Sequence, residues 1–175
     1  MEKPFLLLFL RYVIGFVFIF SLYGKLKNIP SFIQTITNFR FFPQKFSKPL
    51  AYLFLTGEVS VVVSMLIGIN LLFWGFLIAS LMFLAFSIAL TSVLVQNIRT
   101  SCNCFGPDEK DVSVGHVVRS LGFLICGVLG IVITTHIHQY TLLQPEFFLI
   151  VTTGSVSIAF VIVWMNVTEI IKLFQ

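Results

Sequence analysis

Five long apolar runs, separated by polar segments, constrain this chain more than any other feature of its sequence. The runs cover about residues 5–23, 50–67, 71–95, 117–135 and 147–165. At ~1.5 Å per residue, about 20 apolar residues in a helix cross the ~30 Å hydrocarbon core of a bilayer. The runs do not alternate apolar with polar residues, as the strands of a membrane barrel do. We therefore expect an all-α fold, an integral membrane helical bundle of about five transmembrane helices (four core helices plus one).

The composition excludes a water-soluble domain and a nucleic-acid-binding protein. Only 10% of the 175 residues are charged and 58% are hydrophobic, whereas soluble domains carry about 25% charged residues. The formal net charge of +4 is spread among the apolar runs and forms no basic stripe. We expect a single membrane domain over residues 1–175, with membrane lipid as a partner and no nucleic acid.

The segment 24–49, after the first run, is the longest polar stretch. Within it Phe32, Ile33, Ile36 and Phe39 recur at helical spacing. This pattern predicts a short amphipathic helix that lies in the membrane interface. A plain loop with scattered aromatic residues is the alternative.

The loop 96–115 carries the most distinctive motif, Cys-Asn-Cys-Phe-Gly, which begins at Cys102. Two cysteines at positions i and i+2 can bring their Cα atoms within the ~4.4–6.8 Å that a disulfide requires. Such a small ring is strained, and strained, exposed disulfides exchange readily with thiols. Cys102 and Cys104 are therefore candidate catalytic residues for thiol–disulfide exchange. The alternative is a pair of loop residues with no redox role.

The sequence does not favour a metal site. A structural zinc ion takes four nitrogen or sulfur ligands, and on the side of the loop only Cys102, Cys104 and His116 are available. His136 lies ~30 Å away, at the far end of the fourth run. Cys126, in the same run, is expected to be a small packing residue.

Three charged residues in or beside the first two runs are candidates for a structural or proton-linked role. Glu58 lies near the middle of the second run, where an ionised carboxylate is costly unless it is paired. The depths of Glu58 and Arg11 differ by roughly 10 Å, which an arginine side chain can largely bridge. This predicts a structural Arg11–Glu58 clamp. Lys25 follows Gly24, and this pair favours a helix stop with a lysine that reaches the membrane surface.

The charge count and the redox chemistry favour opposite orientations. Five spans place the segment 24–49, the loop 96–115 and the C-terminus on one side, which carries most of the Lys and Arg residues. The positive-inside rule indicates that this side is cytoplasmic. Disulfide chemistry favours the oxidising, extracytoplasmic side, and a cationic amphipathic segment can rest on anionic lipid of either leaflet. We favour the extracytoplasmic side for Cys102 and Cys104 and keep the cytoplasmic side as the alternative.

These residues together resemble the MauE/DoxX family of membrane proteins, and its MauE branch in particular. The resemblance covers about residues 1–125 and includes one specific motif. The matching elements are Arg11 with Gly15, Ser21-Leu22-Tyr23-Gly24-Lys25-Leu26, Phe39-Arg40-Phe41-Phe42-Pro43, Glu58, and Cys102-Asn103-Cys104-Phe105-Gly106. The resemblance implies a multi-pass protein of the inner (plasma) membrane that works beside a thioredoxin-like or disulfide-containing partner protein. MauE is associated with the making of methylamine dehydrogenase, whose small subunit is rich in disulfides.

The resemblance also implies a function and a candidate electron acceptor. Cys102 and Cys104 would be the redox pair of a membrane thiol–disulfide redox protein that supports disulfide formation or maturation of a partner protein. DoxX-type relatives are connected with quinone-linked functions, so a membrane quinone is the candidate acceptor. The layout is also similar to that of vitamin K epoxide reductase relatives, although these have C-x-x-C where this chain has C-x-C. The alternatives are a non-enzymatic membrane assembly factor or anchor for a maturation complex, and a small transporter that depends on Glu58.

Thiol labelling of intact cells with a membrane-impermeant maleimide tests the placement of Cys102 and Cys104. An extracytoplasmic disulfide should take up the label only after mild reduction, because a disulfide sulfur does not react with a maleimide. Labelling without reduction would mean free extracytoplasmic thiols and would weaken a role as an oxidant. Labelling only after permeabilisation would place the loop in the cytoplasm or in a buried position, which favours the assembly factor.

Overall fold

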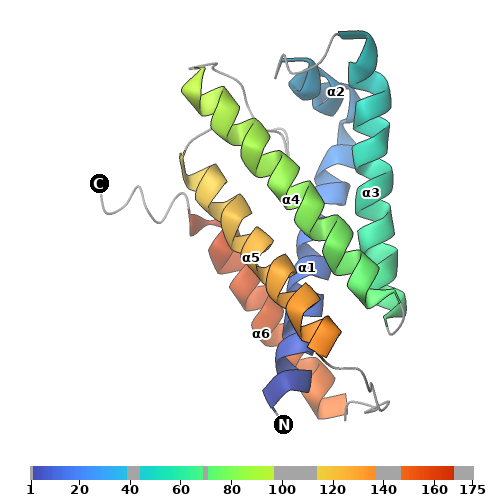
Figure 1. Cartoon of the computed structure of the whole chain (residues 1–175), viewed down its shortest axis with the longest axis vertical. Coiled ribbons are helices and arrows are strands. Elements are labelled where there is room, and N and C mark those ends of the chain that lie inside the picture. The colour runs from blue at the N-terminus through green and yellow to red at the C-terminus, as the bar shows by residue number, and fades with distance from the viewer. Residues whose placement is uncertain (1, 39–43, 69–70, 97–113, 137–146, 168–175) are drawn as a thin grey trace.

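Helices make up nearly all of the chain that the structure describes. The computed structural model describes residues 2–38, 44–68, 71–96, 114–136 and 147–167. The elements, shown in Figure 1, are α1 (Glu2–Lys27), α2 (Ile29–Asn38), the short 3-10 helix η1 (Gln44–Phe46), α3 (Ser47–Ile67), α4 (Leu72–Val95), α5 (Val114–His136) and α6 (Phe147–Met165). Five of them, α1 and α3 to α6, are long and apolar enough to cross a membrane. The predicted all-α membrane bundle with five spans is confirmed.

The helix boundaries follow the positions of proline. Pro30 and Pro49 occupy the first turns of α2 and α3. Backbone N–H groups in a first turn make no hydrogen bond within the helix, so proline, which lacks this group, loses nothing there, and its fixed φ suits a helix. The interiors of α4, α5 and α6 contain no proline, so each apolar run continues as one helix.

The helix α1 is central to the bundle. It packs against α3, α5 and α6, while α4 packs against α3 and α5. Figure 1 shows α1 running up behind α4 and α5 from the N-terminus. The core where these helices meet includes Val13 and Ile14 of α1, Phe76 of α4, Phe123 of α5 and Val161 of α6, all nearly or fully buried.

The short helix after the first span is present as predicted. In α2, the side chain of Phe32 is 3% exposed and packs with Ala51 and Leu55 of α3. The apolar stripe of α2 therefore faces α3. Phe39, the last member of the predicted stripe, lies outside the described residues.

Close contact between α4 and α5 depends on glycine. A Cβ at Gly127 would lie 2.5 Å from the hydroxyl oxygen of Ser80, and one at Gly130 would lie 2.4 Å from the ring of Phe76. Small residues are common where two helices meet inside a membrane. The lipid tails are as apolar as the side chains, so close packing has to drive the association of the helices. The two glycines let the backbone of α5 approach α4.

Replacing Gly130 by alanine should lower the free energy of unfolding by about 1–3 kcal/mol. The added Cβ would overlap the ring of Phe76, which is fully buried. Thermal unfolding of the detergent-solubilised protein, followed by circular dichroism, measures the effect. Gly154→Ala in α6 is the matched control, since its Cβ would meet no described atom within 4 Å. Equal losses in the two variants would contradict a tight α4–α5 contact.

Candidate functional site

A lysine and a glutamate form an ion pair inside the bundle. Lys25 lies in the last turn of α1 and Glu58 near the middle of α3, and both side chains are 0% exposed. The ammonium Nζ of Lys25 donates to Oε1 of Glu58. The hydroxyl of Ser21 donates to the same oxygen at 2.9 Å. Because Ser21 and Lys25 are four residues apart, they share the face of α1 that meets α3.

Two aromatic rings complete the surroundings of the ammonium group. The Nζ of Lys25 lies 4.8 Å from the ring centroid of Phe32 and 4.6 Å from that of Phe86. Both distances fall within the ~6 Å at which the negative face of a ring attracts a cation. Phe32 belongs to α2 and Phe86 to α4, so residues of the first four α-helices surround the buried charge.

The expectation for Lys25 and Gly24 is wrong. The helix α1 does not stop at Gly24 but continues to Lys27, which brings Lys25 onto the helix face that carries Ser21. The helix α2 begins only two residues after α1 ends and places Phe32 over the lysine. Lys25 therefore points into the bundle, where the carboxylate compensates its charge, and does not reach the membrane surface.

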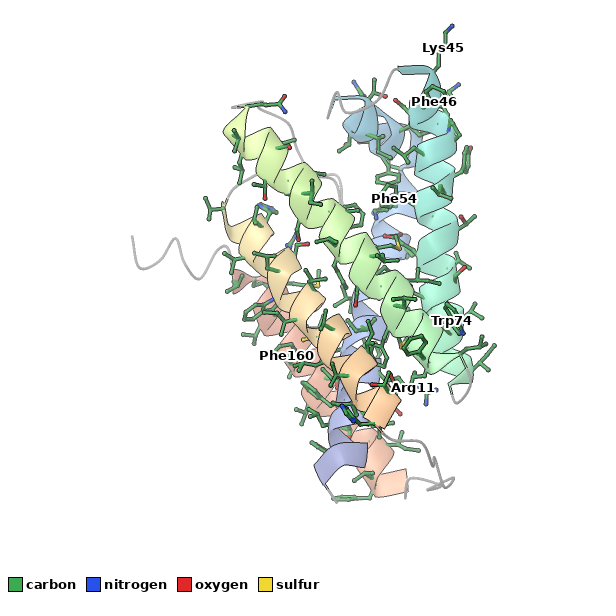
Figure 2. All side chains as sticks on the ribbon, viewed as in Figure 1. Arg11, Lys45, Phe46, Phe54, Trp74 and Phe160 are labelled. Carbon is green, nitrogen blue, oxygen red and sulfur yellow. The ribbon has the colours of Figure 1, made fainter. Side chains whose placement is uncertain are left out.

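The predicted Arg11–Glu58 clamp is also wrong. The Nε of Arg11 donates to the carbonyl oxygen of Met65 at 2.6 Å, and Nη2 donates to that of Leu66 at 2.9 Å. These carbonyls belong to the last turn of α3, which has no intrahelical donors for them. Gly68 follows with a φ of 71°, and a Cβ there would lie 2.9 Å from the Arg11 guanidinium. Figure 2 shows Arg11 beside the end of α3 where the chain turns into α4, so the guanidinium contacts the end of α3 and not Glu58.

A small cavity of about 40 Å³ adjoins the ion pair. The helices α1 and α3 contribute Ser21 and Glu58 to its lining, and α5 contributes His116, Arg119 and Ser120. Phenylalanine rings of α1, α4 and α5 form much of the remaining wall. The cavity therefore connects the buried pair with the beginning of α5.

The polar residues of α5 at this cavity were not recognised as a site from the sequence. His116 and Arg119 are each only 7% exposed, and Nη1 of Arg119 donates to the carbonyl of Met165 at 3.4 Å. Ser87 of α4 donates to the hydroxyl of Ser120 at 2.9 Å. The spacing of His116, Arg119 and Ser120 puts all three on one face of a helix, and this is the signal that could have indicated a shared polar wall.

Of the three cysteines in the sequence, the structure describes one. Cys102 and Cys104 lie outside the described residues. Cys126, in α5, is half-buried and packs against the main core, as a small packing residue would. Within the described part of the chain, no group of three or more His, Cys, Asp or Glu side chains could hold a metal ion.

Five apolar helices and a fully buried ion pair define a multi-pass helical membrane protein. Residues 3–133 match the family model described as methylamine utilisation protein MauE, so the chain belongs to the MauE family. The match includes Arg11, Lys25, Glu58 and the cysteine motif, and it ends within α5. No curated protein and no solved structure matches the chain.

Removing one member of the ion pair should destabilise the bundle far more than removing both. Lys25→Met or Glu58→Gln alone should lower the free energy of unfolding by about 3–5 kcal/mol, because each leaves an uncompensated buried group. The double variant should lose clearly less free energy of unfolding than the two single variants lose together. Thermal unfolding in detergent measures the coupling energy between Lys25 and Glu58. Lys27→Met, at an exposed position, is the control. Additive losses would contradict a paired site.

Proposed function

We propose that this chain is a thiol–disulfide redox protein of the inner (plasma) membrane. Its Cys102–Cys104 pair exchanges disulfides with a thioredoxin-like or disulfide-containing partner protein and so supports disulfide formation or maturation in that partner. Membership of the MauE family agrees with a role in the maturation of other proteins. The extracytoplasmic side is the orientation that suits this chemistry.

One observation supports the proposal, namely a cavity with several polar side chains in its wall, which both helices that flank the cysteine motif help to line. The motif lies in the chain between the end of α4 at Val95 and the start of α5 at Val114. Both helices line the cavity, α4 near its end through Leu90 and α5 near its start through His116. Buried polar groups in a membrane bundle are costly and are typical of functional sites. The cavity therefore brings buried polar side chains to the facing ends of the two helices that the segment with the cysteine motif joins.

The exchange is balanced in electrons and protons. A thiolate of the partner attacks one sulfur of the Cys102–Cys104 disulfide, and the other cysteine leaves as a thiolate that takes up a proton. The second thiol of the partner loses its proton and attacks the mixed disulfide. The products are a partner disulfide and a Cys102–Cys104 dithiol, so two electrons have moved from the partner to this chain. The reverse sequence of steps reduces a partner disulfide.

A quinone ring does not fit the cavity. The space of about 40 Å³ is well below the ~150 Å³ of an apolar cavity that accommodates one benzene molecule. We therefore derive no step through a quinone at this site.

Replacing Cys102 or Cys104 by alanine should abolish maturation of the partner while leaving the amount of this protein in the membrane unchanged. Each variant keeps one thiol, so it should also accumulate a mixed disulfide with the partner, visible on a non-reducing gel. Cys126→Ala is the control, because this residue packs in the core and belongs to no pair. Full function in both single variants would overturn the redox role and favour the non-enzymatic assembly factor.

A further inference from the structure

Three exposed lysines lie at one end of the bundle, on three different elements. Lys27 ends α1, Lys45 lies in η1, and Lys48 is the second residue of α3. The side chains of all three are exposed. Figure 2 shows Lys45 at this end of the molecule, pointing away from the helices. Because α1 and α3 are long and apolar enough to span a membrane, these helix ends belong at the boundary between the hydrocarbon core and the headgroups.

The path of the chain between α1 and α3 brings these lysines to the same end. The helix α2 begins two residues after α1 ends. Its Phe32 packs against Ala51 and Leu55 of α3, and η1 also contacts α3. The segment is therefore folded back onto the beginning of α3 and does not extend away from the bundle.

The positive charge at this end is not compensated by the part of the chain that the structure describes. None of the three lysines forms an ion pair with a described side chain, and Glu58 is already paired with Lys25 inside the bundle. The sequence contains no Asp or Glu between Lys3 and Glu58. Exposed charges of one sign attract a partner of the opposite sign.

Exposed tyrosines lie one helical turn deeper than two of the lysines. Tyr23 precedes Lys27 by four residues in α1, and Tyr52 follows Lys48 by four residues in α3, so each pair shares one helix face. The helix α1 runs toward this end and α3 runs away from it, which places both tyrosines ~6 Å nearer the middle of the bundle. Their side chains are 69% and 56% exposed.

This order of side chains suits a phospholipid. Tyrosine is enriched where the acyl chains meet the headgroups, because its ring is apolar and its hydroxyl can bond to water or to headgroup oxygens. Lysines one turn further out reach the level of the phosphates. Phe46, beside Lys45, is 59% exposed and offers a further apolar contact. A soluble acidic peptide would satisfy the lysines but would leave these rings in water.

We propose that the surface formed by Lys27, Lys45, Lys48, Tyr23 and Tyr52 binds anionic phospholipid. The ammonium groups contact the phosphate and the negative headgroup, and the tyrosines contact the ester region and the upper part of the acyl chains. A zwitterionic headgroup carries its own cation and binds such a surface less well. This inference does not depend on the proposed redox function.

Thermal unfolding of the full-length protein in a neutral detergent, with added phosphatidylglycerol or phosphatidylcholine, tests the proposal. A lipid that binds the folded protein raises the unfolding midpoint, and the dependence of the midpoint on lipid concentration gives the affinity. Wild type should bind phosphatidylglycerol more tightly. The triple variant Lys27→Gln/Lys45→Gln/Lys48→Gln should lose about fivefold in this affinity per lysine, or on the order of 100-fold in total. The triple variant with arginine at the same positions keeps the charges and should keep the preference.

Salt and a tyrosine variant test the two parts of the surface separately. In 1 M salt the preference of wild type should disappear, because the Debye length falls to ~3 Å. Tyr52→Ala should weaken the binding of both lipids. Trp74→Ala is the matched control, since Trp74 is also 56% exposed but lies near the opposite end of α3, at the beginning of α4. This control should leave the affinity for phosphatidylglycerol unchanged.

Four results would overturn the proposal. Wild type could bind the two lipids equally, or the glutamine variant could keep the preference for phosphatidylglycerol. Soluble glycerol phosphate could raise the midpoint as much as the lipid does, which would mean a site for a free phosphate group. The glutamine variant could also be destabilised equally without added lipid, which would mean that the lysines pair with acidic residues of this chain.

Discussion

The pairing of Lys25 with Glu58 is the interaction on which the first half of the bundle depends. Taking either charge out of water costs several kcal/mol, and in a membrane-spanning bundle neither group can stay charged and unpaired. The pair therefore holds α1 against α3, and Ser21 adds a second donor from the same helix face. The helix α2 folds over the ammonium group through Phe32, so one electrostatic requirement determines how three helices are arranged.

A second polar contact joins α1 to the C-terminal end of α3. Arg11 binds the last carbonyls of that helix, and it stands 14 residues before Lys25 on α1, a rise of ~21 Å. Two polar contacts so far apart fix both the rotation and the axial register of α1 against α3. In lipid, apolar packing alone discriminates poorly between such arrangements, because the tails are as apolar as the side chains. The glycines of α5 then allow α4 and α5 to pack closely, and the cavity lies between these helices and the ion pair.

Features that depend on neighbouring residues could be predicted from the sequence, whereas contacts between residues far apart in the chain could not. The five spans and the short helix around Phe32 could be predicted, since each follows from the hydropathy and spacing of neighbouring residues. The partner of Glu58 was predicted wrongly as Arg11. Depth along a helix can be estimated from residue number, but the rotation of one helix relative to another cannot. From the sequence, His116 was considered only as a possible metal ligand, although it lines the cavity together with Glu58 and Arg119. The common face of His116 and Arg119 becomes meaningful only once α5 is placed beside α1 and α3.

The order of the amino acids alone indicates a helical membrane protein with an acid inside its second span and a C-x-C motif between its third and fourth spans. These properties depend on composition and on local order along the chain. The packing of the helices establishes that Lys25 turns inward to meet Glu58, that Arg11 binds the end of α3, and that Glu58 and His116 line one cavity. A buried charge is compensated by whichever group the packing of the helices brings within reach. That choice is made by helix rotation and by the space between helices, which no linear pattern records.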